Sequence, residues 1–224
     1  MSFLNPHGGT YTQSTILITG GATGIGLHLA KKLIELQHTV IVVGRRPDQL
    51  ERAKLLNPLI HTIQRDISSE EERIALHADV MRDFPDINVL FNNAGISDRN
   101  SVPLLKDTTP GDYEIHKNVR SVVFDAPLHL SILFLPHFVI KTHALIANTT
   151  SIIDFVPLVM GVSYSASKGM LCFGYVMCVI LAVVGCCCRY CCCYCCCCCC
   201  CCCCCCCCCC CCHSSVQSVF WWNL

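Results

Sequence analysis

The sequence predicts an α/β fold with a doubly wound parallel sheet that is incomplete at its C-terminal side. Apolar, β-rich runs alternate with helical patterns through the first 168 residues, which is the order of strands and helices in such a sheet. The run Thr39–Val43 is almost entirely apolar, as expected for a strand covered on both faces. A glycine-rich turn joins the first apolar run to the first helical pattern.

Five strands are expected, at residues 15–19, 39–43, 59–64, 89–91 and 143–148. Helices are expected over residues 27–36 and 47–56, after Ser68 and Ser69, and over 112–139. Pro47 suits the first turn of a helix, and the acidic residues 70–72 suit the positive end of a helix dipole. We expect the long helix to be interrupted near Pro127 and to end near Pro136.

The composition divides the chain into two unlike parts. Lysine, arginine, aspartate and glutamate balance at 16 and 16, so no charge excess indicates nucleic acid as a partner. Beyond Lys168 the only charged residue is Arg189, and all 26 cysteines lie at or after Cys172. We therefore expect one domain at 1–172 and a low-complexity tail, not a domain, at 173–224. Because the first part lacks cysteine and a signal-like apolar core, its expected location is cytoplasmic.

Four interpretations of the C-terminal segment compete. The run of 18 cysteines at 195–212 fits translation of a simple nucleotide repeat or of sequence beyond a lost splice site. Residues 169–188 are long and apolar enough for a membrane span. Thiolates could bind soft metals, although ligands normally have defined spacing, and a disulfide scaffold would have no unique pairing. We expect no metal site in the domain itself.

A first motif, Thr19-Gly20-Gly21-Ala22-Thr23-Gly24-Ile25-Gly26, lies between a strand and a helix. Glycines there let the backbone turn tightly and approach a pyrophosphate, and the N–H groups at the helix start face the phosphates. The context indicates a Rossmann-type nucleotide site, with a plain glycine-rich turn as the alternative.

A second motif, Val43-Gly44-Arg45-Arg46, ends the second strand. Sites selective for NAD place a carboxylate at this point to bind the ribose hydroxyls. Gly44 offers none, whereas Arg45 and Arg46 suit a 2′-phosphate. The alternative is a pair of solvated arginines.

Two further motifs follow later strands. Asn92-Asn93-Ala94-Gly95 ends the fourth strand, where small residues and amides fit the cleft at the carboxyl edge of the sheet. Ser151 follows the fifth strand, and Tyr164 and Lys168 are four residues apart, on one face of a helix. Because an ammonium favours the phenolate, Tyr164 is a candidate acid and base, and Ser151 a candidate to hold a reacting oxygen.

In this order, the motifs resemble those of the short-chain dehydrogenases/reductases over about residues 13–172, within a subgroup close to the DltE-type oxidoreductases. The resemblance implies that Asp66 and Ile67 contact adenine, that Asn118 is the catalytic asparagine that supports a proton relay, and that Lys168 also binds the nicotinamide ribose. It assigns the cofactor site to the positions Gly20, Ala22, Thr23, Gly24, Ile25, Gly26, Arg45, Arg46, Asp66, Ile67, Asn92, Ala94, Gly95, Tyr164 and Lys168.

The resemblance stops near Lys168, where the family continues with a longer helix, a sixth strand and a substrate loop. We expect none of these in 173–224, so the fifth strand is expected to be an edge. The family forms homo-oligomers, and without these elements the same assembly is not expected here. The expected function is hydride transfer between NADP(H) and a small carbonyl or alcohol substrate. The alternative is an inactive, truncated remnant that is either unfolded or tethered to a membrane through 169–188.

Overall fold

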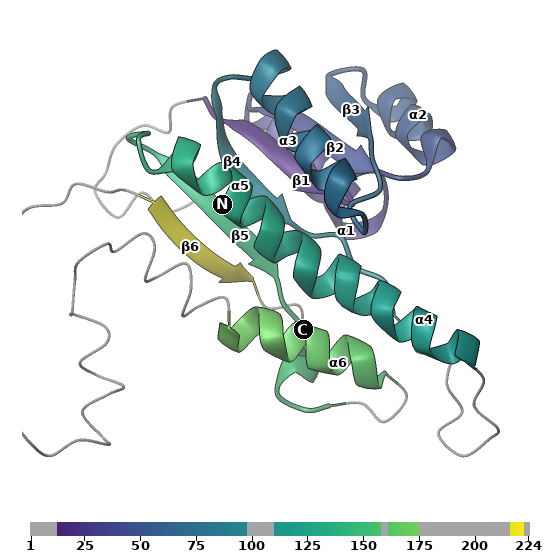
Figure 1. Ribbon diagram of the computed structural model, residues 1–224. Coiled ribbons are helices and arrows are strands. Elements are labelled where there is room, and N and C mark those ends of the chain that lie inside the picture. The colour runs from purple at the N-terminus through teal and green to yellow at the C-terminus, as the bar shows by residue number, and fades with distance from the viewer. Residues whose placement is uncertain (1–12, 98–109, 158–160, 175–215, 222–224) are drawn as a thin grey trace, which may run out of the picture.

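The computed structural model of the 224-residue chain describes residues 13–97, 110–157, 161–174 and 216–221 (Figure 1). A parallel sheet in the order β3-β2-β1-β4-β5-β6 lies at its centre. This confirms the expected α/β fold with a parallel sheet between helices. The strands are β1 (Thr15–Thr19), β2 (Thr39–Gly44), β3 (Ile60–Gln64), β4 (Ile87–Asn92), β5 (Ala144–Thr149) and β6 (Val216–Trp221).

Helices cover both faces of the sheet. The helical elements are α1 (Gly24–Glu35), α2 (Pro47–Leu56), α3 (Glu70–Asp83), α4 (Pro110–Arg120), η1 (Ser121–Asp125), α5 (Ala126–Phe138), η2 (Ile152–Asp154), α6 (Val162–Gly169) and η3 (Met170–Gly174). Residues Ile16 and Ile18 of β1 belong to a core cluster shared with α1 and α2. Leu17, between them, belongs to a second cluster with α3 and α5. Because successive strand residues face opposite sides, a strand buried on both faces needs the unbroken apolar run seen in the sequence.

The start of α3 follows the expected local rules. Ser69 caps the helix, since its hydroxyl oxygen accepts the backbone N–H of Glu72 at 3.3 Å. Three acidic residues fill the first turn, where the helix dipole favours negative charge.

The long helix is interrupted near Pro127 and ends near Pro136, as predicted. The interruption is the five-residue π-helical segment η1, which joins α4 to α5 and ends two residues before Pro127. Proline has no N–H to donate to the residue four positions earlier, and a π turn accommodates this gap in the hydrogen-bond pattern. Pro136 lies inside α5, two residues before the helix ends at Phe138.

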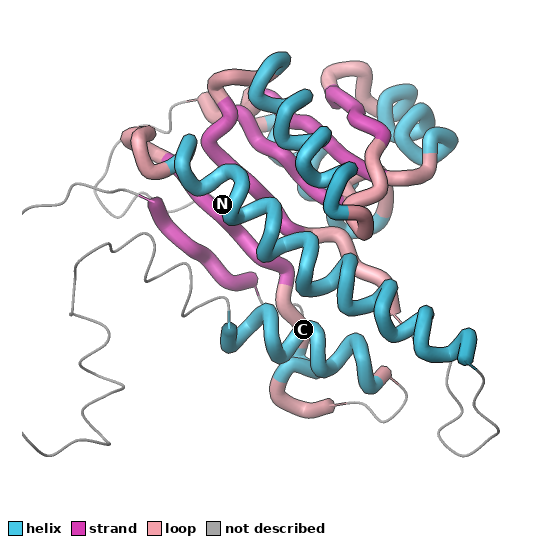
Figure 2. Tube along the Cα trace, viewed as in Figure 1, coloured by secondary structure: helices cyan, strands magenta, loops and turns pink. Residues whose placement is uncertain are grey.

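The expected edge at the fifth strand is also wrong. β6 pairs with β5 in parallel over six residue pairs, from Ala144 with Val216 to Thr149 with Trp221 (Figure 2). Valine, phenylalanine and tryptophan favour strands, but a six-residue segment after a cysteine run shows no pattern that predicts its neighbour. The cysteine run and most of 169–188 lie outside the described residues, so the division at residue 172 stays a prediction.

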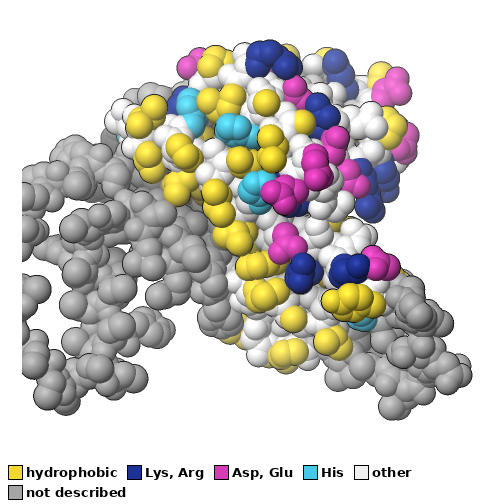
Figure 3. Space-filling view, in the orientation of Figure 1, with side chains coloured by type: hydrophobic (Ala, Val, Ile, Leu, Met, Phe, Trp, Pro, Cys, Tyr) yellow, Lys and Arg dark blue, Asp and Glu magenta, His cyan; other side chains and the backbone are white. Residues whose placement is uncertain are grey.

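One helical stretch of the described residues, Tyr113–Phe138, is long and apolar enough by composition to cross a membrane. Buried side chains such as Leu130 and Phe134 place it in the core against the sheet, which accounts for its apolar character. The surface differs by region (Figure 3): charged side chains gather over α2 and α3, and apolar ones over α5 and α6. The exposed apolar residues there include Ile132, Val162 and Met170.

Candidate active site

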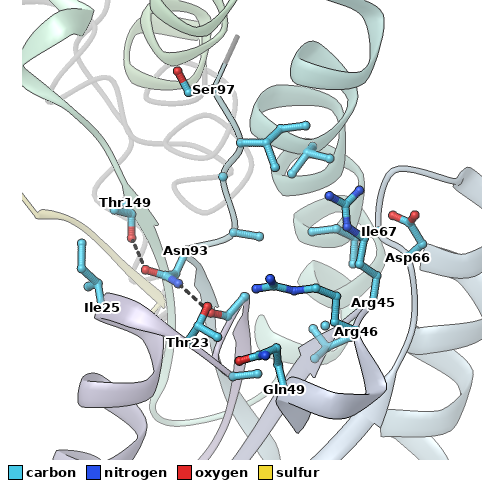
Figure 4. Close-up of a pocket in the computed structure, with 18 of the residues that line it drawn as sticks. Thr23, Ile25, Arg45, Arg46, Gln49, Asp66, Ile67, Asn93, Ser97 and Thr149 are labelled. Atoms are coloured by element: carbon cyan, nitrogen blue, oxygen red, sulfur yellow. Dashed lines mark hydrogen bonds between the residues drawn. The ribbon is translucent and has the colours of Figure 1, made fainter. Parts of the chain in front are cut away.

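A cavity of about 450 Å³ opens at the carboxyl ends of the strands (Figure 4). This is the position of ligand sites in doubly wound sheets. It is lined by residues that follow β1, β2, β3, β4 and β5, together with side chains of α6 and η1. The predicted residues that line it are Gly20, Ala22, Thr23, Ile25, Arg45, Arg46, Asp66, Ile67, Ala94, Gly95, Ser151, Tyr164 and Lys168.

The glycine turn after β1 is built for close approach of backbones. Gly20 has a φ of +65°, and a Cβ there would lie 2.9 Å from the Cα of Ala94. A Cβ at Gly26 would lie 2.5 Å from the carbonyl oxygen of Gly20 and 2.6 Å from Nδ2 of Asn93. Gly24 has a φ of +53° and an open surrounding. Gly24 and Gly26 are not among the lining residues, so they are part of the turn but do not face the cavity.

The two asparagines of the third motif have different surroundings. Asn92, predicted to bind cofactor, is 2% exposed and donates to Oδ1 of Asn148 at 2.9 Å, away from the cavity lining. Asn93 lines the cavity and donates from Nδ2 to the carbonyl oxygen of Thr19 at 3.0 Å. It ties the end of β4 to the glycine turn. Two adjacent asparagines give no sequence signal for which one faces the cleft.

Three arginines, Arg45, Arg46 and Arg65, line the cavity beside β2 and β3, and they differ in their partners. Arg65 forms ion pairs with Glu72 at 3.2 Å and Asp79 at 2.8 Å, and these acids hold the pKa of its guanidinium above the usual value. Arg45 and Arg46 are exposed and have no acidic partner among the described residues. In Figure 4 they lie with Gln49 across the cavity from Thr149.

Hydrogen bonds with Arg73 and Ser68 hold the segment Asp66–Ile67 in place. The buried Arg73 donates from Nη1 to the carbonyl oxygens of Ile67 at 2.8 Å and Ser68 at 3.1 Å. Its Nε lies 3.0 Å from Nδ1 of His129 on α5. Asp66 accepts both the backbone N–H and the hydroxyl of Ser68. Sequence reasoning missed Arg73, because an arginine on a predicted helix is usually a surface residue.

The catalytic end of the cavity is built on α6 and the end of β5. Tyr164 lies against the third motif, since a Cβ at Gly95 would be 4.0 Å from its ring carbon Cε2. The Nζ of Lys168 lies 5.9 Å from the centroid of the Tyr164 ring and donates to the carbonyl oxygen of Thr149. Ser151, the N-cap of η2, lines the same end. The structure therefore brings Ser151, Tyr164 and Lys168 together as the sequence predicted.

Lys168 is unusual for a lysine, with only 3% of its surface exposed. Burial lowers the pKa of its ammonium to about 8, and the carboxylate of Asp154 opposes this shift. A buried cation beside a phenol favours the phenolate.

Asn118, expected to be catalytic, is not at this end. It is exposed on α4 and does not line the cavity, whereas Val122 of η1 does. The π-helical segment begins three residues after Asn118, so the turn that follows Asn118 does not have regular α-helical spacing. Within the described residues, no group of three or more histidine, cysteine, aspartate or glutamate side chains could hold a metal ion.

The sequence profile of the short chain dehydrogenases matches residues 14–177. The chain belongs to this family. It is 43% identical over 164 residues to the uncharacterized oxidoreductase DltE of Bacillus subtilis, a match that covers 71% of this chain and 62% of DltE. It is 30% identical over 163 residues to serine 3-dehydrogenase of Agrobacterium fabrum, with the same two coverages of 71% and 62%. The DltE-type resemblance is thereby confirmed.

A solved metagenomic short-chain oxidoreductase in complex with NADP has the same fold, with a TM-score of 0.66, 24% identity, and coverage of 75% of each chain. The chain spans about three fifths of the length of its two curated relatives, DltE and serine 3-dehydrogenase. Its place in this enzyme family, the oxidoreductase class and the Rossmann-like fold follow from these matches.

Proposed function

We propose that the protein transfers hydride between NADP(H) and a small carbonyl or alcohol compound. The observation that carries the proposal is the buried Lys168 beside Tyr164 and Ser151 at one end of the cavity. Lysine is almost never fully buried unless its charge is paired, because removing the ammonium from water is costly. A perturbed ammonium in a cleft next to a phenol is typical of acid and base chemistry.

The residues of the cavity fit a dinucleotide. Gly20 packs against Ala94, and Gly26 against Gly20 and Asn93, so closely that neither position has space for a side chain. This packing forms the tight turn before α1, whose first N–H groups could bind a pyrophosphate. Ile67 offers an apolar surface to adenine, and Lys168 and Tyr164 would hold the nicotinamide ribose. When bound, the cofactor supplies or accepts the hydride.

The chain's own residues handle the proton. Ser151 would orient the substrate oxygen by a hydrogen bond, and Tyr164 would give its phenolic proton to that oxygen during reduction, or take it during oxidation. The ammonium of Lys168 stabilises the phenolate that results, which makes Tyr164 a better acid. The role of Asn118 as a relay residue stays a prediction.

The preference for NADP(H) over NAD(H) is supported by charge at the adenosine end. Arg65 is already neutralised by Glu72 and Asp79, whereas Arg45 and Arg46 have no acidic partner among the described residues. A guanidinium with no internal partner is available to a 2′-phosphate. Gly44 leaves the end of β2 without the carboxylate that would bind ribose hydroxyls. We further propose a cytoplasmic location, since the described domain needs no disulfides.

The test is carbonyl reduction by the full chain in reducing buffer, with NADPH and a panel of small aldehydes and ketones. Tyr164→Phe should lower kcat by about 10²–10⁴-fold, the usual contribution of an acid or base catalyst, while NADPH binding changes little. A protein that folds and binds NADPH but reduces no substrate would support the inactive alternative. Substantial activity in the Phe variant would contradict the role of Tyr164.

A further inference from the structure

A buried carboxylate lies behind the catalytic residues and has no role in the reaction proposed above. Asp154, the last residue of η2, is 8% exposed. Its Oδ2 accepts the backbone N–H of Ser151 at 3.1 Å. Its Oδ1 is buried and has no hydrogen-bond partner among the described residues. Burial of an oxygen without a partner disfavours the charged form of the carboxyl, and an opposite charge nearby counteracts this cost.

The compensating charge is on α6. Burial raises the pKa of the Asp154 carboxyl above its usual value, and the hydrogen bond from the Ser151 N–H and the charge of Lys168 both oppose this shift. The two elements pack directly, since the carbonyl oxygen of Asp154 lies 3.8 Å from the place of a Cβ at Gly169. Opposite charges attract more strongly in a protein interior than in water. A negative charge at Asp154 therefore favours the ammonium form of Lys168.

Within the described residues, the thiol of Cys172 on η3 is a further titratable group that the charge of Asp154 affects. Burial and the Asp154 carboxylate both raise the pKa of this thiol, so it stays neutral near pH 7. The thiol therefore adds no charge beside the carboxylate.

We propose that Asp154 is a positioning residue for the hydride-transfer reaction, acting on two catalytic residues at once. This inference rests on the proposed function. Its charge keeps Lys168 protonated in a buried place, and its hydrogen bond fixes the backbone of Ser151 at the end of β5. Without the charge, burial would act on Lys168 unopposed. More of the lysine would then be neutral at neutral pH, and Tyr164 would lose the cation that stabilises its phenolate.

The test measures the titration of Lys168 directly, in the cofactor-free full chain under reducing conditions. Lysine labelled with ¹³C at the ε position reports each ammonium by NMR, and Lys168→Arg identifies the signal. Asp154→Asn keeps an oxygen that can accept the Ser151 N–H but removes the charge. The matched control is Asp83→Asn, which removes an exposed carboxylate paired with Arg82.

The expected result is a Lys168 midpoint that is lower in D154N than in the unsubstituted chain and is unchanged in D83N. The alkaline limb of the pH profile of kcat/KM should move in the same direction. An unchanged midpoint in folded D154N would overturn the proposal and leave Asp154 as a helix cap. If D154N does not fold, Asp154→Ser offers a smaller neutral acceptor and carries the same measurement.

The NMR readout does not depend on turnover, so the two proposals fail separately. A lowered midpoint in a protein that reduces no carbonyl would contradict the proposed function and uphold the coupling of Asp154 to Lys168. A fixed midpoint in an active enzyme would do the reverse. Asp154→Ala removes charge and hydrogen bond together, so it should add a rise in KM, from loss of Ser151 orientation, to the shifted pH profile.

Discussion

The two ends of the cavity use charge in opposite ways. At the end beside β2 and β3, Arg45 and Arg46 are exposed and have no acidic partner within the described chain, so they keep their attraction for an anionic ligand. At the end beside α6, Lys168 lines the cavity and is buried, as is Asp154 on the neighbouring η2. Water and salt screen the interactions of exposed charges, so removing one changes stability little. A buried charge interacts more strongly with its surroundings, and removing its partner is destabilising. Substitutions at the two ends should therefore differ in kind as well as in size.

The largest effect is expected from Lys168→Met. Loss of the ammonium should lower kcat by about 10²–10⁴-fold, because Tyr164 loses the charge that tunes it. Thermal stability should fall, since loss of the ammonium leaves the buried Asp154 carboxylate without an opposite charge. Steady-state kinetics and thermal unfolding check this together, with exposed Lys54→Met as the control. A large loss of stability with kcat retained would mean that Lys168 serves the fold and not the reaction.

Gly26→Ala should be the next in size. Its Cβ would lie 2.5 Å from the carbonyl oxygen of Gly20, and overpacking of this kind costs about 1–3 kcal/mol. Urea unfolding measures the loss of stability, and NADPH titration the damage to the glycine turn. Gly24→Ala is the matched comparison, because its Cβ meets nothing within 4 Å and only the positive φ costs energy. Equal effects of the two substitutions would contradict the steric argument.

Arg45→Ala should weaken NADPH binding about tenfold or more relative to NADH. A hydrogen bond to a charged group is worth about 1.5–3 kcal/mol, and 1.4 kcal/mol corresponds to a factor of ten. The measurement is fluorescence titration with both cofactors, with Arg82→Ala on α3 as the control. The preference should also shrink as salt is raised, since exposed charges are screened. Parallel loss for NADPH and NADH would argue against a 2′-phosphate contact.

The smallest effect is a decrease in folding stability at acid pH. Burial lowers the pKa of His77, and the charge of His137 adds to this; burial is also the main cause that lowers the pKa of His137. Because the unfolded chain binds these protons more tightly than the folded one, stability is full above about pH 6.5 and falls below it. Urea unfolding at pH 7.5 and 5.5 should show the loss, and His77→Gln should reduce it. A pH-independent midpoint between these values would contradict the histidine assignment.

Local chemistry made much of the molecule predictable. The strands, the glycine turn and the Tyr164–Lys168 face follow from patterns that span at most a dozen residues, and each is found where the sequence placed it. The failures involve contacts between distant segments. Nothing in the sequence pairs Val216–Trp221 with β5, and nothing beside Asn118 indicates the π-helical segment that carries Val122 to the cavity. Asp154 was missed for the same reason, since its importance lies in a lysine fourteen residues away.

Arg73 gives the molecule a mechanical link between its two ends. Its guanidinium donates to the carbonyl oxygen of Ile67, in the loop that also carries Asp66, and to Nδ1 of His129 on α5. The hydroxyl of Ser121, at the start of η1, donates to the carbonyl oxygen of Ser68 in the same loop. The loop is thus hydrogen-bonded to η1 and α5. These elements directly follow α4, which packs beside α6. A continuous chain of hydrogen bonds and helix contacts therefore runs from the loop of Asp66 and Ile67 to the helix that carries Tyr164 and Lys168.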